Sequence, residues 1–101
     1  MLSIKFTDAQ GKAKKTYTAV GLKSGIVDKL LGVAEKQAQA QQGEQSAAEQ
    51  KALWSEMMAL IVEVFGRQFT YDELADGADI QEIVRCFQSL NSFVTESVSK
   101  N

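Results

Sequence analysis

The chain opens with an alternation of apolar and polar residues that predicts a strand. Leu2, Ile4 and Phe6 are apolar and the residues that follow each of them are polar, so one strand face is expected to be buried. Residues 8–11, Asp-Ala-Gln-Gly, have turn-forming composition, and residues 16–20 are β-branched and aromatic. The two runs predict a β-hairpin. Because an isolated hairpin is only marginally stable in water, we expect one face to pack on helices.

A helical period begins at residue 24. Ser24 is a suitable N-cap, and the apolar residues after it fall on one broad helix face: Ile26, Val27, Leu30, Leu31, Val33 and Ala34. This face ends near Ala34, because Gln37 and Gln41 take the next positions. Residues 36–50 hold six glutamines, four alanines and one glycine. We therefore expect a frayed helix end and a mobile Gln/Ala-rich connector at about residues 36–47.

Three capping motifs predict where the other helices begin. Each has a short polar residue followed three positions later by glutamate: Ser46-x-x-Glu49, Thr70-x-x-Glu73 and Asp79-x-x-Glu82. Gly66 is the expected end of the helix after the first motif. The helix after the second motif should be short, because Asp76-Gly77 follows closely. Phe69 and Leu74 are spaced as a hydrophobic staple around its start.

The helices after residues 46 and 79 both have strong apolar faces. In the first helix this face comprises Leu53, Trp54, Met57, Met58, Leu60, Ile61, Val64 and Phe65. In the last helix it comprises Ile80, Ile83, Val84, Phe87, Leu90, Val94 and Val98, flanked by Cys86 and Phe93. The sequence predicts a mainly α, α+β fold: an N-terminal β-hairpin packed on a bundle of three longer helices and one short helix. Residues 1–101 are expected to form a single domain.

Composition narrows the functional classes. The chain has 101 residues, no histidine and no proline, a net charge of -2 and a pI near 5.1. Without histidine, a catalytic triad or zinc site has little to be built from, and the charge does not favour nucleic-acid binding. No apolar run approaches the roughly 18 residues that span a bilayer. We expect a non-enzymatic cytoplasmic protein with no cofactor, metal, nucleic acid or membrane.

The charged residues are unevenly distributed. Five acidic residues and one glycine occur between Thr70 and Val84, but their spacing does not fit the twelve-residue calcium loop, so we expect a solvated cluster at helix starts. Residues 1–23 hold five lysines and only one acid, Asp8. These two regions attract each other weakly if subunits associate. The single Cys86 is expected to be an inert packing residue.

Partner-binding candidates come from the second half of the chain. Phe65 and Phe69 are expected to close the core while Gly66 makes the turn. The apolar surplus of the preceding helix either fills the core, forms a groove for an amphipathic partner helix, or is buried in a homo-oligomer. Tyr71 beside Arg67 offers contact area of the kind found at binding hot spots. The candidate residues are Trp54, Met57, Met58, Ile61, Arg67 and Tyr71.

Residues 61–84 carry a resemblance to a known family. The pattern Val-x-Val-Phe-Gly-x-Gln-Phe-Thr-x-Asp-x-Leu-x-Asp-Gly, residues 62–77, resembles the tail assembly chaperones of long-tailed, siphophage-type bacteriophages and prophages. The resemblance implies a small protein of the host cytoplasm that binds the aggregation-prone tape measure protein during tail assembly. It also implies absence from the mature virion, and a longer frameshifted product whose extension recruits the tail tube protein.

A second hypothesis is a small helical regulatory or DNA-associated module without catalytic activity, with residues 70–94 as a helix–turn–helix. Its recognition helix, residues 80–100, balances Glu82 and Glu96 against Arg85 and Lys100, so it lacks a basic face. For the chaperone hypothesis, the ending Ser99-Lys100-Asn101 is compatible with codons on which ribosomes slip back by one base. The nucleotide sequence tests that expectation directly.

Overall fold

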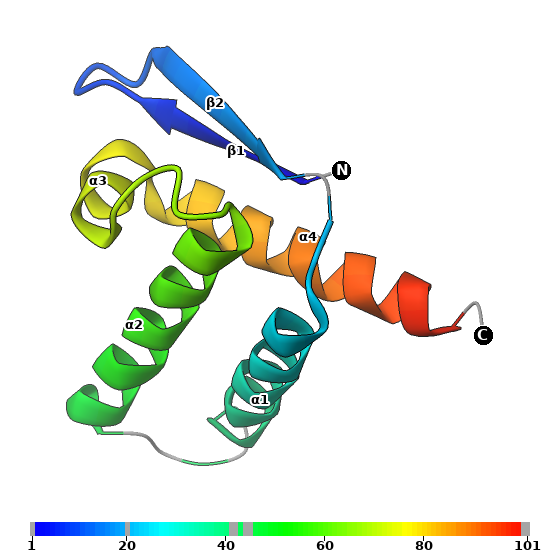
Figure 1. Ribbon diagram of the computed structural model, residues 1–101. Helices are drawn as coiled ribbons and strands as arrows, with labels where there is room; N and C mark the ends of the chain where they lie inside the picture. The colour runs from blue at the N-terminus through cyan, green and yellow to red at the C-terminus, as the bar shows by residue number, and fades with distance from the viewer. Residues whose placement is uncertain (1, 20, 41–42, 44–45, 100–101) are drawn as a thin grey trace.

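The protein folds as a hairpin followed by four helices (Figure 1). The computed structural model describes residues 2–19, 21–40, 43 and 46–99, with side chains up to Thr95. The elements in chain order are β1 (Leu2–Thr7), β2 (Ala13–Ala19), α1 (Ser24–Ala40), α2 (Ala47–Val64), α3 (Tyr71–Gly77) and α4 (Ile80–Ser99). The predicted architecture, a β-hairpin with three longer helices and one short helix, is confirmed.

The hairpin is antiparallel and has one buried face. Leu2, Ile4 and Phe6 are buried while Ser3 and Lys5 are exposed, as the alternation predicted. At the turn, the Asp8 side chain accepts hydrogen bonds from the N–H groups of Gln10 and Lys12 at 2.9 and 3.0 Å. Pairing joins Leu2 to Ala19, Ser3 to Thr18, Ile4 to Tyr17, Lys5 to Thr16 and Phe6 to Lys15. The register then shifts, so Lys14 is an extra residue in a bulge.

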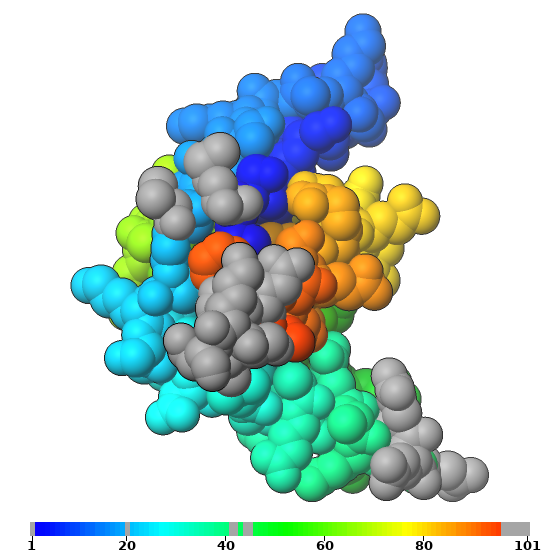
Figure 2. Space-filling model, turned by 90° about the vertical axis from the view of Figure 1, so that its right-hand side faces the viewer, coloured from blue at the N-terminus to red at the C-terminus, as the bar shows by residue number. Residues whose placement is uncertain are grey.

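The core lies where the hairpin and the helices meet, and α1 contributes Leu30 and Val33 to it. Four aromatic rings connect the hairpin to the helices, with centroids 4.8 to 5.8 Å apart: Phe6, Tyr17, Phe65 and Phe69. Phe65 and Phe69 are 1% and 2% exposed, so their predicted place in the core is confirmed. In the space-filling view the hairpin is at the top, α1 is at the bottom and α4 lies between them (Figure 2).

The predicted helix starts are confirmed for α2, α3 and α4. Thr70 and Glu73 form the complete reciprocal capping box, whereas Ser46 caps only the N–H of Glu49. The prediction that Ser24 caps α1 is wrong. Ser24 is already helical, because the carbonyl of Lys23 accepts the first helical hydrogen bond, from Val27 at 3.2 Å.

Three apolar residues predicted to share buried faces are exposed. Leu31 is 51%, Ile80 66% and Val84 39% exposed. At 100° per residue, Leu31 and Val84 each lie about 100° from the buried residue one position before them, at the margin of the apolar face. Residues at one edge of an apolar face are exposed because a neighbouring element covers only the other edge. Val98 of the same predicted face lies beyond the described side chains.

The helix α1 extends into the segment expected to be a connector. Residues 36–40 are helical, Lys36 pairs with Glu56, and the side-chain amide of Gln37 donates to the sulfur of Met57 at 3.1 Å. These polar contacts to α2 hold the last turns of α1 in place, where α1 no longer has large apolar side chains. Residues 41, 42, 44 and 45 of the expected connector lie outside the described residues, and Ala47 begins α2.

Candidate partner-binding surfaces

A groove with an apolar floor runs between α1 and α2. Its central part has a volume of about 420 Å³ and is floored by Gly32 and Val33 of α1 and by Ala59 and Leu60 of α2. A second hollow of about 340 Å³ adjoins it and includes Ala40, Ala52 and Leu53. The two hollows share Lys36 and Glu56, so together they follow the helix pair toward the residues that connect the helices.

Two ion pairs cross this groove. Lys29 Nζ lies 3.0 Å from Glu63 Oε2, and Lys36 Nζ lies 2.9 Å from Glu56 Oε1. The partners on each helix are seven residues apart, about two turns, so the pairs match the register of two antiparallel helices. All four side chains are substantially solvated, so each pair contributes no more than about 1 kcal/mol. They add charge to both rims of the apolar floor.

The residues predicted to bind a partner are divided between core and surface. Met57, Met58 and Ile61 are 5%, 3% and 0% exposed, so in this structure they fill the core and offer no surface to a partner. Trp54 is half-buried and packs against the same core. Arg67 and Tyr71 are exposed, as predicted.

Arg67 and Tyr71 contribute to different surfaces. The Tyr71 hydroxyl is 3.4 Å from the Ser55 hydroxyl, which joins the start of α3 to the first half of α2. Arg67 instead lines a hollow of about 780 Å³ at the end of α2 and the start of α1, together with Lys23 and Lys29. Its backbone has a positive φ of 60° directly after Gly66 at 67°, and its N–H donates to the carbonyl of Val62. The hollow that Arg67 lines includes no residue of α3.

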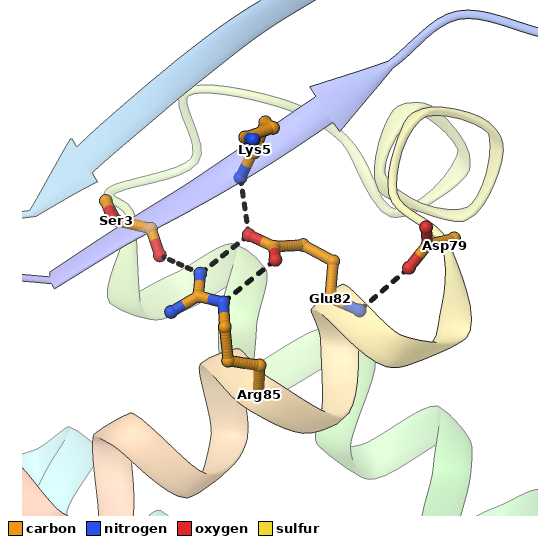
Figure 3. A network of polar contacts seen from close by, with 5 residues as sticks. All are labelled: Ser3, Lys5, Asp79, Glu82 and Arg85. Atoms are coloured by element: carbon orange, nitrogen blue, oxygen red, sulfur yellow. Dashed lines mark hydrogen bonds and ion pairs between the residues drawn. The ribbon is translucent and has the colours of Figure 1, made fainter. Parts of the chain in front are cut away.

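A polar network fixes α4 against the outer edge of β1 (Figure 3). The Glu82 carboxylate accepts a hydrogen bond from the backbone N–H of Lys5 at 2.7 Å, and Arg85 donates to the carbonyl of Ser3 at 3.0 Å. Arg85 also binds Glu82 at 2.6 and 2.8 Å. The two side chains thus supply the acceptor and donor that a neighbouring strand would supply.

Only one of the two hydrogen bonds of the predicted capping box at Asp79 and Glu82 forms, because the network takes up the Glu82 carboxylate. Asp79 accepts from the N–H of Glu82 at 2.8 Å, as an N-cap should. The Glu82 carboxylate does not return to Asp79, because it is held by Lys5 and Arg85. The Arg85 hydrogen bond lowers the pKa of Glu82, against the opposite effect of partial burial, and it raises the pKa of Arg85. Burial raises the pKa of the neighbouring Cys86 to about 11, in agreement with an inert packing thiol.

A family model described as a phage tail chaperone protein matches residues 1–101. This chain belongs to the phage tail chaperone family. The resemblance seen in residues 62–77 is therefore confirmed, and the match extends across the glutamine-rich middle of the chain. No curated protein and no solved structure gives a significant match to it.

The family is of a non-catalytic kind, so the features of this chaperone that matter for its function are surfaces that can bind a partner. Among its described residues, no group of three or more cysteine or acidic side chains is placed to hold a metal ion. Its described helices include none long and apolar enough to cross a membrane. Protein partners in tail assembly follow from the family assignment.

The groove predicted from the apolar face of α2 did not include α1, although the charged residues of the two helices indicate their pairing. Lys29 and Lys36, like Glu56 and Glu63, are spaced by one heptad, which matches an antiparallel pair with complementary charges. Gly32 and Ala59 do not stand out in the sequence, because small residues contribute little to an apolar pattern. Their importance appears only when the two helices are placed side by side.

Replacing Glu82 with glutamine should destabilise the chaperone by about 1–3 kcal/mol at neutral pH, because two charge-assisted hydrogen bonds to Arg85 are weakened. The folded protein holds the Glu82 pKa below its usual value of 4.5, so the carboxylate stabilises the fold above that pH. This contribution is lost as the pH falls below 4.5 through the lowered pKa. Urea unfolding of both proteins across this pH range should show their difference shrinking toward acid.

The matched control is Glu63→Gln, which removes the exposed ion pair with Lys29. It should cost less than about 1 kcal/mol at neutral pH. Equal losses for the two variants, or a Glu82→Gln difference that grows toward acid pH, would contradict the structural role of the network.

Proposed function

We propose that this chaperone binds an apolar helical segment of the tape measure protein and keeps it soluble while the tail tube assembles around it. The observation that carries the proposal is the groove between α1 and α2, with its apolar floor and charged rims. An amphipathic helix that lies in such a groove buries its apolar face and leaves its polar face in water. The family assignment favours this assembly role over the DNA-associated hypothesis.

Small residues make the groove suitable for a helix. Apart from its chain neighbours and the nearby backbone of α1, no atom lies within 4 Å of the position that a Cβ on Gly32 would occupy, and Ala59 is exposed on the facing helix. A client helix can therefore approach the backbone of α1 over Gly32 and Ala59, while the buried Val33 and Leu60 close the base beneath them. Each square ångström of apolar area buried there contributes about 25 cal/mol, before the costs of association.

The test is co-expression with the tape measure protein. We expect Ala59→Glu to remove most of the gain in soluble client that the wild-type chaperone gives, because a buried unpaired carboxylate opposes docking. The change is at an exposed helical position, so the chaperone itself should stay folded. Soluble client is measured in the supernatant, and chaperone folding by circular dichroism.

The matched control is Ala75→Glu, an exposed alanine-to-glutamate change on α3 that lies outside the groove. It should leave the client yield unchanged. Tyr71→Glu is the third arm, because it tests the exposed surface predicted from the sequence. Loss of client solubility with Tyr71→Glu and not with Ala59→Glu would transfer the binding site to that surface. No gain in soluble client with the wild-type chaperone would overturn the proposed function.

The proposal includes the setting in which the chaperone acts. It acts in the cytoplasm of the bacterial host, before the tail is complete, and it is absent from the mature virion. A frameshifted longer product would bring the tail tube protein to the same client. Residues 100 and 101, on which the frameshift expectation rests, lie outside the described residues. Association into a homo-oligomer remains part of the proposal, with sedimentation of the purified chain as its measurement.

A further inference from the structure

The hairpin has two outer edges, one on β1 and one on β2, and their backbone groups are hydrogen-bonded to different extents. In an antiparallel ladder, residues whose N–H and C=O face the partner strand alternate with residues that face away. The Lys5 N–H and the Ser3 carbonyl bind Glu82 and Arg85, so these two residues face away from β2. Their cross-strand partners, Thr16 and Thr18, must face away from β1 on the opposite edge.

This geometry leaves the edge of β2 open. The Thr18 carbonyl accepts a hydrogen bond from the side-chain amide of Gln68 at 2.8 Å, which confirms that it points outward. The N–H and C=O of Thr16 have no partner among the described residues. β1 lies between β2 and α4, so the Thr16 edge faces away from the helices (Figure 1). The chaperone therefore closes the β1 edge with an ion pair and leaves the N–H and C=O of Thr16 open on the β2 edge.

The charge around this open edge is of one sign. Lys12 directly precedes β2, and Lys14 and Lys15 lie at the start of β2 next to the turn; all three are exposed. None is in an ion pair between described residues, and Lys15 lies over the Tyr17 ring at 4.7 Å. Toward the other end of β2, the side chains of Thr16, Tyr17, Thr18 and Ala19 are uncharged.

We infer that the β2 edge is a strand-docking site for an extended segment of a partner protein that is acidic at one end and uncharged at the other. The segment adds a third strand through the N–H and C=O of Thr16, and takes the place of Gln68 at the Thr18 carbonyl. Its acidic end lies beside the lysines. A second copy of β2 is not the occupant, because residues 13–19 contain no acid to supply the counter-charge.

The test uses the full chain and two short synthetic peptides of alternating valine and threonine. One peptide carries two acidic residues at its N-terminus, for a strand parallel to β2, and the other carries them at its C-terminus, for an antiparallel strand. We expect chemical-shift changes and slowed amide exchange at Thr16 in the isotope-labelled chaperone. Thr16→Pro removes the outward N–H and no hydrogen bond to β1, so it should fold and should weaken peptide binding by about tenfold or more. Thr16→Val keeps the N–H and is the matched control, with affinity close to wild type.

Two peptide variants test the inference on the unaltered chaperone. A peptide with lysine in place of its acidic residues should bind at least about tenfold more weakly, and so should a peptide N-methylated on the face that meets Thr16. Equal binding of the acidic and basic peptides, no binding of any peptide, or self-association of the free chain through β2 would overturn the inference. In that case the lysines only protect the edge from pairing. The groove is tested by co-expression with the Ala59→Glu variant and the β2 edge by peptide binding. The result of the peptide experiment therefore does not decide the proposed function.

Discussion

Replacing Phe69 with alanine is expected to lower the free energy of unfolding by about 3–5 kcal/mol. Phe69 is 2% exposed, and its ring centroid lies 5.0 Å from that of Phe6, 4.8 Å from Tyr17 and 5.8 Å from Phe65. It contacts both strands and the end of α2, so its loss leaves a cavity where the hairpin meets the helices. For a domain with a total stability of about 5–15 kcal/mol, this is a large fraction.

Urea unfolding followed by circular dichroism measures the effect, and amide exchange in β1 and β2 locates it. Tyr71→Ala is the control from the same segment, because Tyr71 is 38% exposed and its hydroxyl meets only the surface of α2. It should cost about 1 kcal/mol or less. Equal losses for the two variants would show that the aromatic cluster does not hold the hairpin in place.

Gly77→Ala should also destabilise the protein, by about 1–3 kcal/mol, although glycine-to-alanine changes in helices usually stabilise. Gly77 ends α3 directly beneath β1. A Cβ at this position would lie 2.5 Å from Cδ2 of Phe6 and 3.0 Å from two other atoms of the same ring. The ring is held by Tyr17 and Phe69, so it cannot move aside without disturbing the aromatic cluster. Thermal or urea unfolding measures the loss.

Gly32→Ala is the matched control for this change. Gly32 lies in the middle of α1, and apart from its chain neighbours and the nearby backbone of α1 no atom lies within 4 Å of the place that its added Cβ would take, so alanine should stabilise by about 0.5–1 kcal/mol. The two substitutions are chemically identical and should have opposite signs. A gain in stability for Gly77→Ala would mean that β1 does not pack on α3 as closely as the structure shows.

Most of the elements could be predicted because their determinants are local. The alternation of Leu2, Ile4 and Phe6 and the turn at Asp8 define the hairpin within a few residues of sequence. Thr70 and Glu73 lie one helical turn apart, and their side chains satisfy each other's backbone N–H groups. A motif of this kind works in the same way whatever packs above it, so the sequence is enough to place the helix start.

The candidate sites were predicted less well, because exposure is not local. Met57, Met58 and Ile61 are in the core and Ile80 and Val84 are not, although the sequence pattern placed all of them on apolar helix faces. Glu82 shows the same limit. Its position in a capping motif predicted a bond to the backbone of Asp79, but its carboxylate binds the Lys5 N–H of β1 and the Arg85 side chain of its own helix instead.

The sequence by itself determined the family, the order of strands and helices, and the residues able to cap or bury them, because these depend on neighbours a few positions away. The tertiary structure decided which flank of each helix is covered, where α1 and α2 form a groove, and which edge of the hairpin stays open. Those features join residues up to 82 positions apart, such as Ser3 and Arg85. Periodicity describes a single helix or strand, and contact between two elements requires their relative placement.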